Sequence, residues 1–459
     1  MKRPIEPFRI KVVEPVKLVS RKEREILIKK AGFNVFKLPA EKVFIDLLTD
    51  SGTSAMSDNQ WAGLMTGDES YAGCRNFFHL QDTVRDVMGF EFVIPTHQGR
   101  SAENILFSTL LSKNSVVPSN IHFDTTRANI EYLGARAEDC VIDEGLDPEA
   151  DYPFKGNLDL RKLAHTLSRY GKKRIPLVCL TITNNSGGGQ PVSMENIRQI
   201  SDFCHRNKLL FFLDAARFAE NAYFIKLREA GYQHLMVKDI VKKMFSYADG
   251  CWVSAKKDAL VNIGGFIALR DEKLFHRLQN LLILHEGFPT YGGLAGRDLE
   301  AIARGLKEVL EEDYLAYRIA HTAYLGNLLL DAQIPVVRPI GGHAVYLNAK
   351  KFVSHIPQSQ FPAQALVVAL YREAGIRAVE IGGLMFAKKN PKNGRWIYPE
   401  LELVRLAIPR RVYTSSHLDY VADAVLRIAK KIDQLKGLKV VYEPPFLRHF
   451  TAVLQEIDR

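Results

Sequence analysis

The chain has 459 residues, of which 47% are hydrophobic and 25% are charged. These fractions are typical of a globular protein, and they exclude the disordered, collagen-like and coiled-coil classes. The formal net charge is +10, from 62 Lys and Arg against 52 Asp and Glu. The basic residues are spread along the whole sequence without a basic cluster or tail, so the charge gives little support to a nucleic-acid binder.

The N-terminus and the cysteines favour a cytoplasmic protein. The first 17 residues carry basic and acidic side chains and lack the apolar core of a signal peptide. No run of about 18 uncharged apolar residues occurs that could span a membrane. Five cysteines, at positions 74, 140, 179, 204 and 251, are too widely spaced for CxxC pairs. An odd, scattered set of this kind is typical of reduced thiols.

Strand-like and helix-like segments alternate between about residues 90 and 270. The apolar runs FVIPTH, IPLVCLTIT and LLFFLDAA are each followed by an amphipathic stretch of helical length, at residues 102–111, 194–206 and 217–229. This alternation predicts βαβ units and therefore an α/β fold, with a mostly parallel sheet covered by helices on both faces. In such sheets the functional side chains lie at the carboxyl ends of the strands.

A second, smaller α+β region is predicted after a long helical stretch at residues 298–331. Its apolar runs are at 343–347, 376–381 and 401–408, and a helix follows at 417–432. We expect an N-terminal arm that forms part of the small domain at 1–56, a large domain at 57–310 and the small C-terminal domain at 311–459.

The common sequence motifs of ATP-binding, dinucleotide-binding and zincin proteins are missing. Polar residues that follow apolar runs offer a different candidate site. Asp214 follows the apolar run LLFFL, and a second short apolar run, at CWV, is followed by the Ser254 hydroxyl and by two lysines. Of these two we expect Lys257 to be the reactive one, with Lys256 near a phosphate or facing solvent. A carboxylate that keeps a pyridine nitrogen protonated, with a lysine amine that forms a Schiff base, is what a pyridoxal phosphate site requires. Taken singly, Asp214 could be a helix-capping residue and Lys257 a surface lysine. The pair together favours the cofactor site.

Other residues could complete such a site. Gln98, Gly99 and Arg100 stand between a strand and a helix, where backbone donors and a cation can bind a phosphate, and the Ser254 hydroxyl could contribute. Phe123 could stack on the cofactor ring, and Arg405 could bind a substrate carboxylate. An ordinary strand-to-helix turn and a core phenylalanine are the alternatives for Gln98–Arg100 and Phe123.

Blocks along nearly the whole chain resemble the β-eliminating lyases: EPFRI, FIDLLTDSGT, PTHQGR, GGQPVS, ENAYFIK, YGGLAGRD, GGHAV, FPAQAL and IPRRVYT. This resemblance implies the fold of the aspartate aminotransferase type (fold type I), with pyridoxal phosphate as cofactor. It also implies a homotetramer built from dimers with active sites at the interface, and a monovalent cation, usually potassium.

The resemblance agrees with the roles argued above for Lys257, Asp214, the phosphate-binding residues, Phe123 and Arg405, and it implies further ones. Arg217 and Asn185 would contact the cofactor's phenolic oxygen and the region of the substrate carboxylate. Tyr71 would be a general acid that reaches across the dimer interface. The carboxylate pocket would be lined by Thr49 and Ser51, and the cation would be bound at Gly52, Glu69 and Asn262.

Members of this family release either indole from tryptophan or phenol from tyrosine, and three positions favour indole here. The resemblance places Asp124 where the phenol-releasing enzymes carry Thr, Ile381 where they carry a substrate-binding Arg, and His449 where they carry Phe. Ile381 cannot donate a hydrogen bond to a phenolic oxygen, whereas Asp124 and His449 could handle the proton of an indole ring. Asp124 could otherwise be a turn residue and His449 an ordinary buried histidine. Phenol release from tyrosine is the alternative activity, and polyanion binding is the alternative from a different class.

Overall fold

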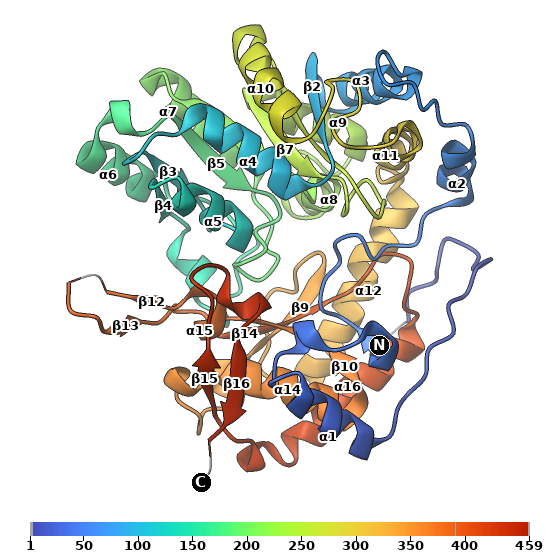
Figure 1. Ribbon diagram of the computed structural model, residues 1–459, viewed down its shortest axis with the longest axis vertical. Coiled ribbons are helices and arrows are strands. Elements are labelled where there is room, and N and C mark those ends of the chain that lie inside the picture. The colour runs from blue at the N-terminus through green and yellow to red at the C-terminus, as the bar shows by residue number, and fades with distance from the viewer. Residues whose placement is uncertain (1–2, 391, 458–459) are drawn as a thin grey trace. The chain divides into compact units, whose positions relative to one another are not determined.

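The structure is a computed structural model that describes residues 3–390 and 392–457 (Figure 1). The chain forms two compact units. Unit 1 contains Met1–Asp50, Leu146–Asp151 and Tyr317–Arg459, and unit 2 contains Ser51–Gly145 and Tyr152–Ala316. Throughout the described residues, each helix is too short or too polar to span a bilayer.

A five-stranded mixed sheet forms the centre of unit 2, with strand order β2-β8-β7-β6-β5. The pairs β5–β6 and β6–β7 are parallel, whereas β8 is antiparallel to both β7 and β2. A separate parallel pair joins β3 and β4. The strands are β2 (Phe92–Thr96), β3 (Val116–Ser119), β4 (Arg136–Asp139), β5 (Leu177–Thr181), β6 (Leu210–Asp214), β7 (Gly250–Ser254) and β8 (Gly265–Leu269).

Ten helices belong to unit 2: α2 (Asp58–Met65), α3 (Arg75–Met88), α4 (Gly99–Leu110), α5 (Asp124–Tyr132), α6 (Leu160–Tyr170), α7 (Met194–Asn207), α8 (Phe218–Arg228), α9 (Val237–Ser246), α10 (Glu272–His285) and α11 (Gly296–Glu308). Three of the strands and the helices that follow them match the predicted βαβ units. Local capping reinforces the pattern, as at α7, where the Ser193 hydroxyl accepts a hydrogen bond from the Asn196 backbone N–H at 3.1 Å.

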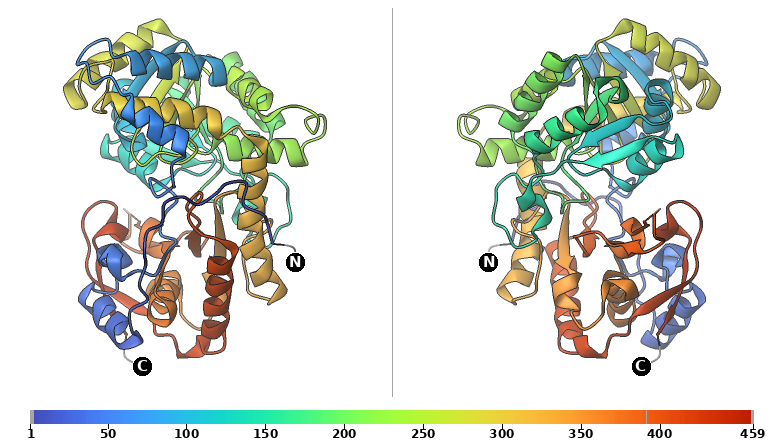
Figure 2. Two further views of the ribbon diagram at one scale, coloured as in Figure 1. Left: turned by 90° about the vertical axis from the view of Figure 1, so that its right-hand side faces the viewer. Right: turned by 90° about the vertical axis from the view of Figure 1, so that its left-hand side faces the viewer.

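Helices cover both faces of the sheet of unit 2 (Figures 1 and 2). On β6, Phe212 packs in an apolar cluster with residues of α4 and α10, whereas Phe211 and Leu213 pack in a second cluster with residues of α3, α7, α8, α9 and α11. Because helices cover both faces, the strands read as continuous apolar runs in the sequence. On β5 and β6 the last residue of the strand is polar, Thr181 and Asp214 respectively.

The helical stretch predicted at 298–331 is two helices, α11 and α12 (Glu312–Asp331). The backbone tightens after α11, where Leu310 N–H donates to Lys307 O and Glu311 N–H to Glu308 O. The Glu312 carboxylate then accepts hydrogen bonds from the backbone of Val237 at 3.0 Å and from Lys226 Nζ. The break depends on these contacts, and neither Gly nor Pro marks it in the sequence.

Unit 1 is built on an antiparallel sheet, β11-β14-β9, with a parallel pair β1–β10 and an antiparallel pair β15–β16. Its predicted apolar runs and its C-terminal helix are present. The strands are β1 (Ile45–Asp46), β9 (Ala344–Asn348), β10 (Ile376–Arg377), β11 (Val379–Ile381), β14 (Leu403–Ala407), β15 (Leu438–Tyr442) and β16 (Val453–Glu456), with a small pair β12 (Lys388–Lys389) and β13 (Trp396–Ile397). The helices include α1 (Arg21–Lys30), α13 (Ala349–Phe352), α14 (Pro362–Ala374), α15 (Gly383–Phe386) and α16 (Ser415–Ala429).

Candidate active site

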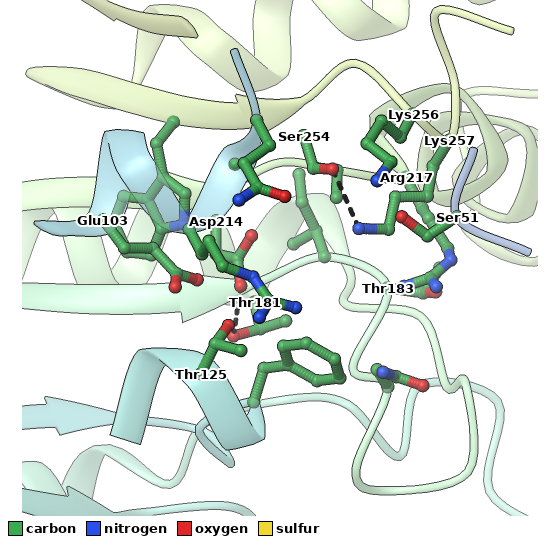
Figure 3. A pocket seen from close by; sticks show the side chains of 18 residues that line it. Ser51, Glu103, Thr125, Thr181, Thr183, Asp214, Arg217, Ser254, Lys256 and Lys257 are labelled. Atoms are coloured by element: carbon green, nitrogen blue, oxygen red, sulfur yellow. Dashed lines mark hydrogen bonds between the residues drawn. The ribbon is translucent and has the colours of Figure 1, made fainter. Parts of the chain in front are cut away.

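A pocket in unit 2 lies at the carboxyl ends of β5, β6 and β7 and at the start of α4 (Figure 3). It brings together ten of the residues predicted from the sequence. They are Ser51, Gln98, Gly99, Arg100, Phe123, Asn185, Asp214, Arg217, Ser254 and Lys257. Lys256, the sequence neighbour of Lys257, also lines this pocket.

Lys257 and Asp214 have the surroundings that the sequence interpretation requires. Lys257 Nζ donates a hydrogen bond to Ser254 Oγ at 2.9 Å, and Thr181 Oγ1 donates one to Asp214 Oδ2 at 3.4 Å (Figure 3). Burial raises the pKa of Asp214 to about 6, although the Lys257 and Arg217 charges oppose that change. A buried carboxyl of this kind is stabilised as the carboxylate when a further cation, such as a protonated pyridine nitrogen, lies against it.

The backbone at the start of α4 is closely packed. A Cβ built on Gly99 would lie 2.6 Å from Ser254 Cβ, and a Cβ on Gly265 would lie 2.7 Å from the Gly99 backbone nitrogen. Two cations, Arg100 and Lys256, line the same pocket, and burial together with the Arg100 charge lowers the pKa of Lys256. Backbone approach at a helix N-terminus beside two cations suits a phosphate group. The residues present thus fit both ends of pyridoxal phosphate.

Glu103 is a pocket residue that the sequence interpretation missed. It lies one turn into α4, and its carboxylate accepts hydrogen bonds from Thr126 Oγ1 at 2.6 Å and Asn129 Nδ2 at 3.3 Å. Burial and the charge of Asp214 raise its pKa to about 7. The pocket therefore holds two carboxyl groups with elevated pKa values, which is a common property of active sites.

Glu103 should make the cofactor-free protein less stable as the pH rises. Its carboxyl pKa is about 7 in the folded chain against an ordinary 4.5. The contribution of the protonated Glu103 carboxyl to the free energy of unfolding is therefore complete below about pH 4.5. It is lost as the pH rises through about 7, and the loss is at most roughly 3 kcal/mol. Glu103→Gln removes the titration. Urea unfolding of both cofactor-free proteins should show a free-energy gap that is small at pH 5 and larger, in favour of the variant, at pH 8. Parallel pH profiles would contradict the assignment.

Three further pocket residues, Thr181, Thr183 and Trp252, were also not predicted. Thr181 ends β5 and Trp252 lies on β7 directly beside Asp214 of β6 in the sheet register. The signal that could have found Thr181 is the one that found Asp214, a polar residue directly after a buried strand. Trp252 carries no such signal because a tryptophan inside an apolar run reads as core.

Two of the predicted proton-transfer residues lie in unit 2 outside the set that lines the pocket. Tyr71 is 70% exposed, and its ring contacts those of Phe288 and Tyr291 at centroid distances of 5.5 and 5.4 Å. A hydrogen bond with Tyr291 raises the pKa of the Tyr71 phenol. Asp124 is buried at the start of α5, where its carboxylate accepts from the Thr125 backbone N–H at 2.7 Å.

Two of the three positions expected at the cation site lie together. Asn262 Nδ2 donates to the backbone oxygens of Gly52 at 3.0 Å and Ser54 at 3.1 Å. The Glu69 carboxylate instead accepts from the Gly296 backbone N–H at the start of α11 and pairs with Arg297 at 3.1 Å. Within the part of the chain that the structure describes, no group of three or more His, Cys, Asp or Glu could hold a metal ion.

The predicted carboxylate-binding residues Arg405 and Thr49 belong to unit 1. Arg405 is buried on β14, and its Nη2 donates to Leu48 O at 3.0 Å. Thr49 follows Leu48 directly. The next residue, Asp50, forms a buried ion pair with Arg410 at 2.9 Å, a contact that the sequence did not reveal. Two arginines therefore hold the segment that carries Thr49.

Ile381 and His449 also lie in unit 1, and both are buried. Ile381 ends β11 within an apolar cluster against which Phe36 packs. The His449 ring lies edge-on to Phe36 at 5.8 Å and against Phe450 at 4.0 Å. Phe36 thus contacts the His449 ring and packs against the cluster that contains Ile381.

Comparison with known families decides the class of this protein. Residues 46–424 match the model of the family described as Beta-eliminating lyase. The chain belongs to the β-eliminating lyase family. The chain is 57% identical over 451 residues to a tryptophanase from Salinibacter ruber, and the match covers 98% of this chain and 95% of that protein. It is also 53% identical over 449 residues to a tyrosine phenol-lyase from Pasteurella multocida, covering 98% of each.

Comparison with solved structures confirms the predicted fold of this β-eliminating lyase. An aromatic aminotransferase from Pyrococcus horikoshii has a TM-score of 0.58 at 13% identity, and the match covers 90% of this chain and 99% of that one. Family and fold together imply pyridoxal phosphate, which the pocket residues fit. The protein is therefore a pyridoxal phosphate-dependent β-eliminating lyase. Relatives of both activities match at similar identity, so their names leave the substrate open.

Proposed function

We propose that this lyase converts L-tryptophan and water to indole, pyruvate and ammonia. The support for an amino-acid lyase is the pocket that unites Lys257 and Asp214 at neighbouring strand ends. The observation that carries the choice of tryptophan is Ile381, which lies in an apolar cluster and has no donor for a phenolic oxygen.

The pocket residues divide the work on the amino-acid part of the substrate. The bound cofactor supplies electron withdrawal from the substrate Cα. In this proposal Lys257 takes the Cα proton at Nζ, while the Asp214 carboxylate keeps the ring nitrogen of the cofactor protonated. Arg405 fixes the substrate carboxylate, with Thr49 and Ser51 in the same carboxylate pocket.

The aromatic leaving group needs different help. Indole departs after a proton is added at its C3 atom, and we assign that transfer to Tyr71 with assistance from Asp124 and His449. Asp124 can accept a hydrogen bond from the indole N–H, and the imidazole of His449 has ring nitrogens that can donate or accept a hydrogen bond. Ile381 contributes apolar surface where a phenol-releasing enzyme would need a donor.

The proposal is tested by assaying one preparation, reconstituted with pyridoxal phosphate in potassium buffer, on tryptophan and tyrosine side by side. We expect kcat/KM for indole release to exceed that for phenol release by at least about tenfold, the effect of one lost hydrogen-bond partner. Equal or faster phenol release would instead establish the alternative activity, elimination from tyrosine.

His449→Phe provides a variant that separates the role of the imidazole from its packing. A phenyl ring can keep the contacts with Phe36 and Phe450 but cannot exchange a proton. We expect kcat/KM for tryptophan to fall by about 100-fold, with kcat/KM for S-methyl-L-cysteine, whose leaving group has no ring, within about threefold of wild type. An equal fall for both substrates would contradict a role at the leaving group.

Three further properties are proposed from the family resemblance and the composition. We propose a homotetramer built from dimers, with potassium bound at Gly52, Asn262 and Glu69. We also propose that the enzyme works in the cytoplasm, since all five cysteines are free and buried. Its partners would be its small-molecule substrate and its own copies, without nucleic acid or membrane.

A further inference from the structure

Arg448, in the 3₁₀ turn Arg448–Phe450 of unit 1, is buried among backbone carbonyl groups. Its Nε donates to Leu384 O and its Nη2 to Gly383 O, each at 2.5 Å. Its Nη1 forms an ion pair with Glu443 at 2.9 Å. The planar guanidinium thus contacts two backbone oxygens and one carboxylate at the same time. A lysine ammonium at this position could not make all three contacts.

The backbone N–H groups of α15, the short helix that contains Gly383 and Leu384, also form hydrogen bonds. The Glu402 carboxylate accepts from the Gly383 backbone N–H at 2.9 Å, and Glu380 accepts from those of Leu384 at 2.8 Å and Met385 at 3.1 Å. Two buried carboxyl groups and one guanidinium therefore fix the backbone of residues 383–385 from opposite sides.

The Arg448 side chain is itself fixed in place. Its guanidinium lies 4.7 Å from the Trp396 ring centroid and 5.7 Å from that of Phe361. Rings beside a planar cation restrict its rotation and add attraction. Because Arg448 is buried, its contacts persist with little competition from water.

These contacts tie together two segments that are far apart in the sequence. Ile381 precedes Gly383 by two residues, and His449 follows Arg448 directly. The apolar cluster that contains Ile381 packs against Phe36, and the Phe36 ring also contacts the His449 ring. The guanidinium is therefore a direct polar link between the segment that carries Ile381 and the segment that carries His449.

We propose that Arg448 is a positioning residue that sets the selectivity for the aromatic leaving group, by holding Ile381 and His449 at a fixed spacing. This inference rests on the proposed function, which assigns the leaving group to those two residues. A displacement of about 1 Å at such a position can cost up to about 100-fold in rate. A leaving group without a ring does not use the two residues and should be insensitive to the displacement.

Arg448→Lys tests the proposal because it keeps the charge and loses the fork. We expect kcat/KM for tryptophan to fall by about tenfold or more while kcat/KM for S-methyl-L-cysteine stays within about twofold of wild type. The matched control is Arg427→Lys, because Arg427 also pairs with a carboxylate, Glu373 at 3.1 Å, and lies 5.8 Å from a ring, Tyr420. The control should change neither value. An equal fall for both substrates in Arg448→Lys, or no fall, would overturn the proposal.

Failure of the proposed function would look different. If the wild-type enzyme prefers tyrosine, kcat/KM for tyrosine is measured in place of that for tryptophan. We still expect Arg448→Lys to lower that value selectively, relative to kcat/KM for S-methyl-L-cysteine. Hydrogen exchange supplies a readout without any substrate. In Arg448→Lys the amides of 383–386 and 448–452 should exchange at least about tenfold faster, with β9 and β14 unchanged. Unchanged exchange in both segments would show that no such link exists.

Discussion

Lys257→Ala should abolish covalent attachment of pyridoxal phosphate and lower kcat for indole release by roughly 10³-fold or more. The size of the effect follows from the loss of both the amine that holds the cofactor and the base that takes the Cα proton. Borohydride reduction followed by intact-mass measurement should show a cofactor adduct on the wild-type chain and none on the variant.

Lys256→Ala is the matched control for that experiment, since the two lysines are adjacent and line the same pocket. This variant should still carry the covalent adduct and should instead bind the cofactor more weakly, because Lys256 stands beside Arg100 at the phosphate end. If Lys256→Ala lost the adduct and Lys257→Ala kept it, the two assignments would have to be exchanged.

Asp214→Asn should give the second large loss, about 10²- to 10³-fold in kcat, because an amide cannot keep the ring nitrogen of the cofactor protonated. Burial raises the pKa of this carboxyl to about 6, so the group is still mostly ionised at pH 7, and a protonated ring nitrogen against it would stabilise the carboxylate further. Steady-state kinetics in cofactor-saturated buffer measures the loss.

Glu103→Gln, at the neighbouring carboxyl of the same pocket, is the control for Asp214→Asn. The pKa of Glu103 is about 7, so this group is largely neutral below that pH, and its replacement by an amide should change kcat by less than about threefold. A loss at Glu103→Gln as large as at Asp214→Asn would mean that the two carboxyl groups act together as one proton-sharing unit.

The parts of the fold that local sequence determines were predicted well. Strands buried on both faces must be apolar throughout, so β2, β5 and β6 were visible as continuous runs, each with its helix. The reversed direction of β8 was not visible, because an apolar run carries no sign of its direction. The break between α11 and α12 depends on the contacts of Glu312 with Lys226 and α9, which only the folded chain reveals.

The site was predictable where a polar residue follows a buried strand, as at Asp214, and where backbone must approach closely, as at Gly99. Glu103 escaped because a Glu in the first turns of an amphipathic helix usually faces solvent. The role of Arg448 was not predicted because two of its partners are backbone carbonyl groups, which leave no pattern in the sequence. The roles of Tyr71 and of the cation positions came from the family resemblance and remain predictions.

We propose that this pocket releases the side chain of tryptophan as intact indole. The product stoichiometry of the reconstituted wild-type enzyme, with L-tryptophan as the sole substrate, is the decisive measurement. We predict indole, pyruvate and ammonia in equal amounts, with Lys257→Ala forming none of them above background. Ammonia without indole, or an enzyme that leaves tryptophan intact while releasing phenol from tyrosine, would contradict the account.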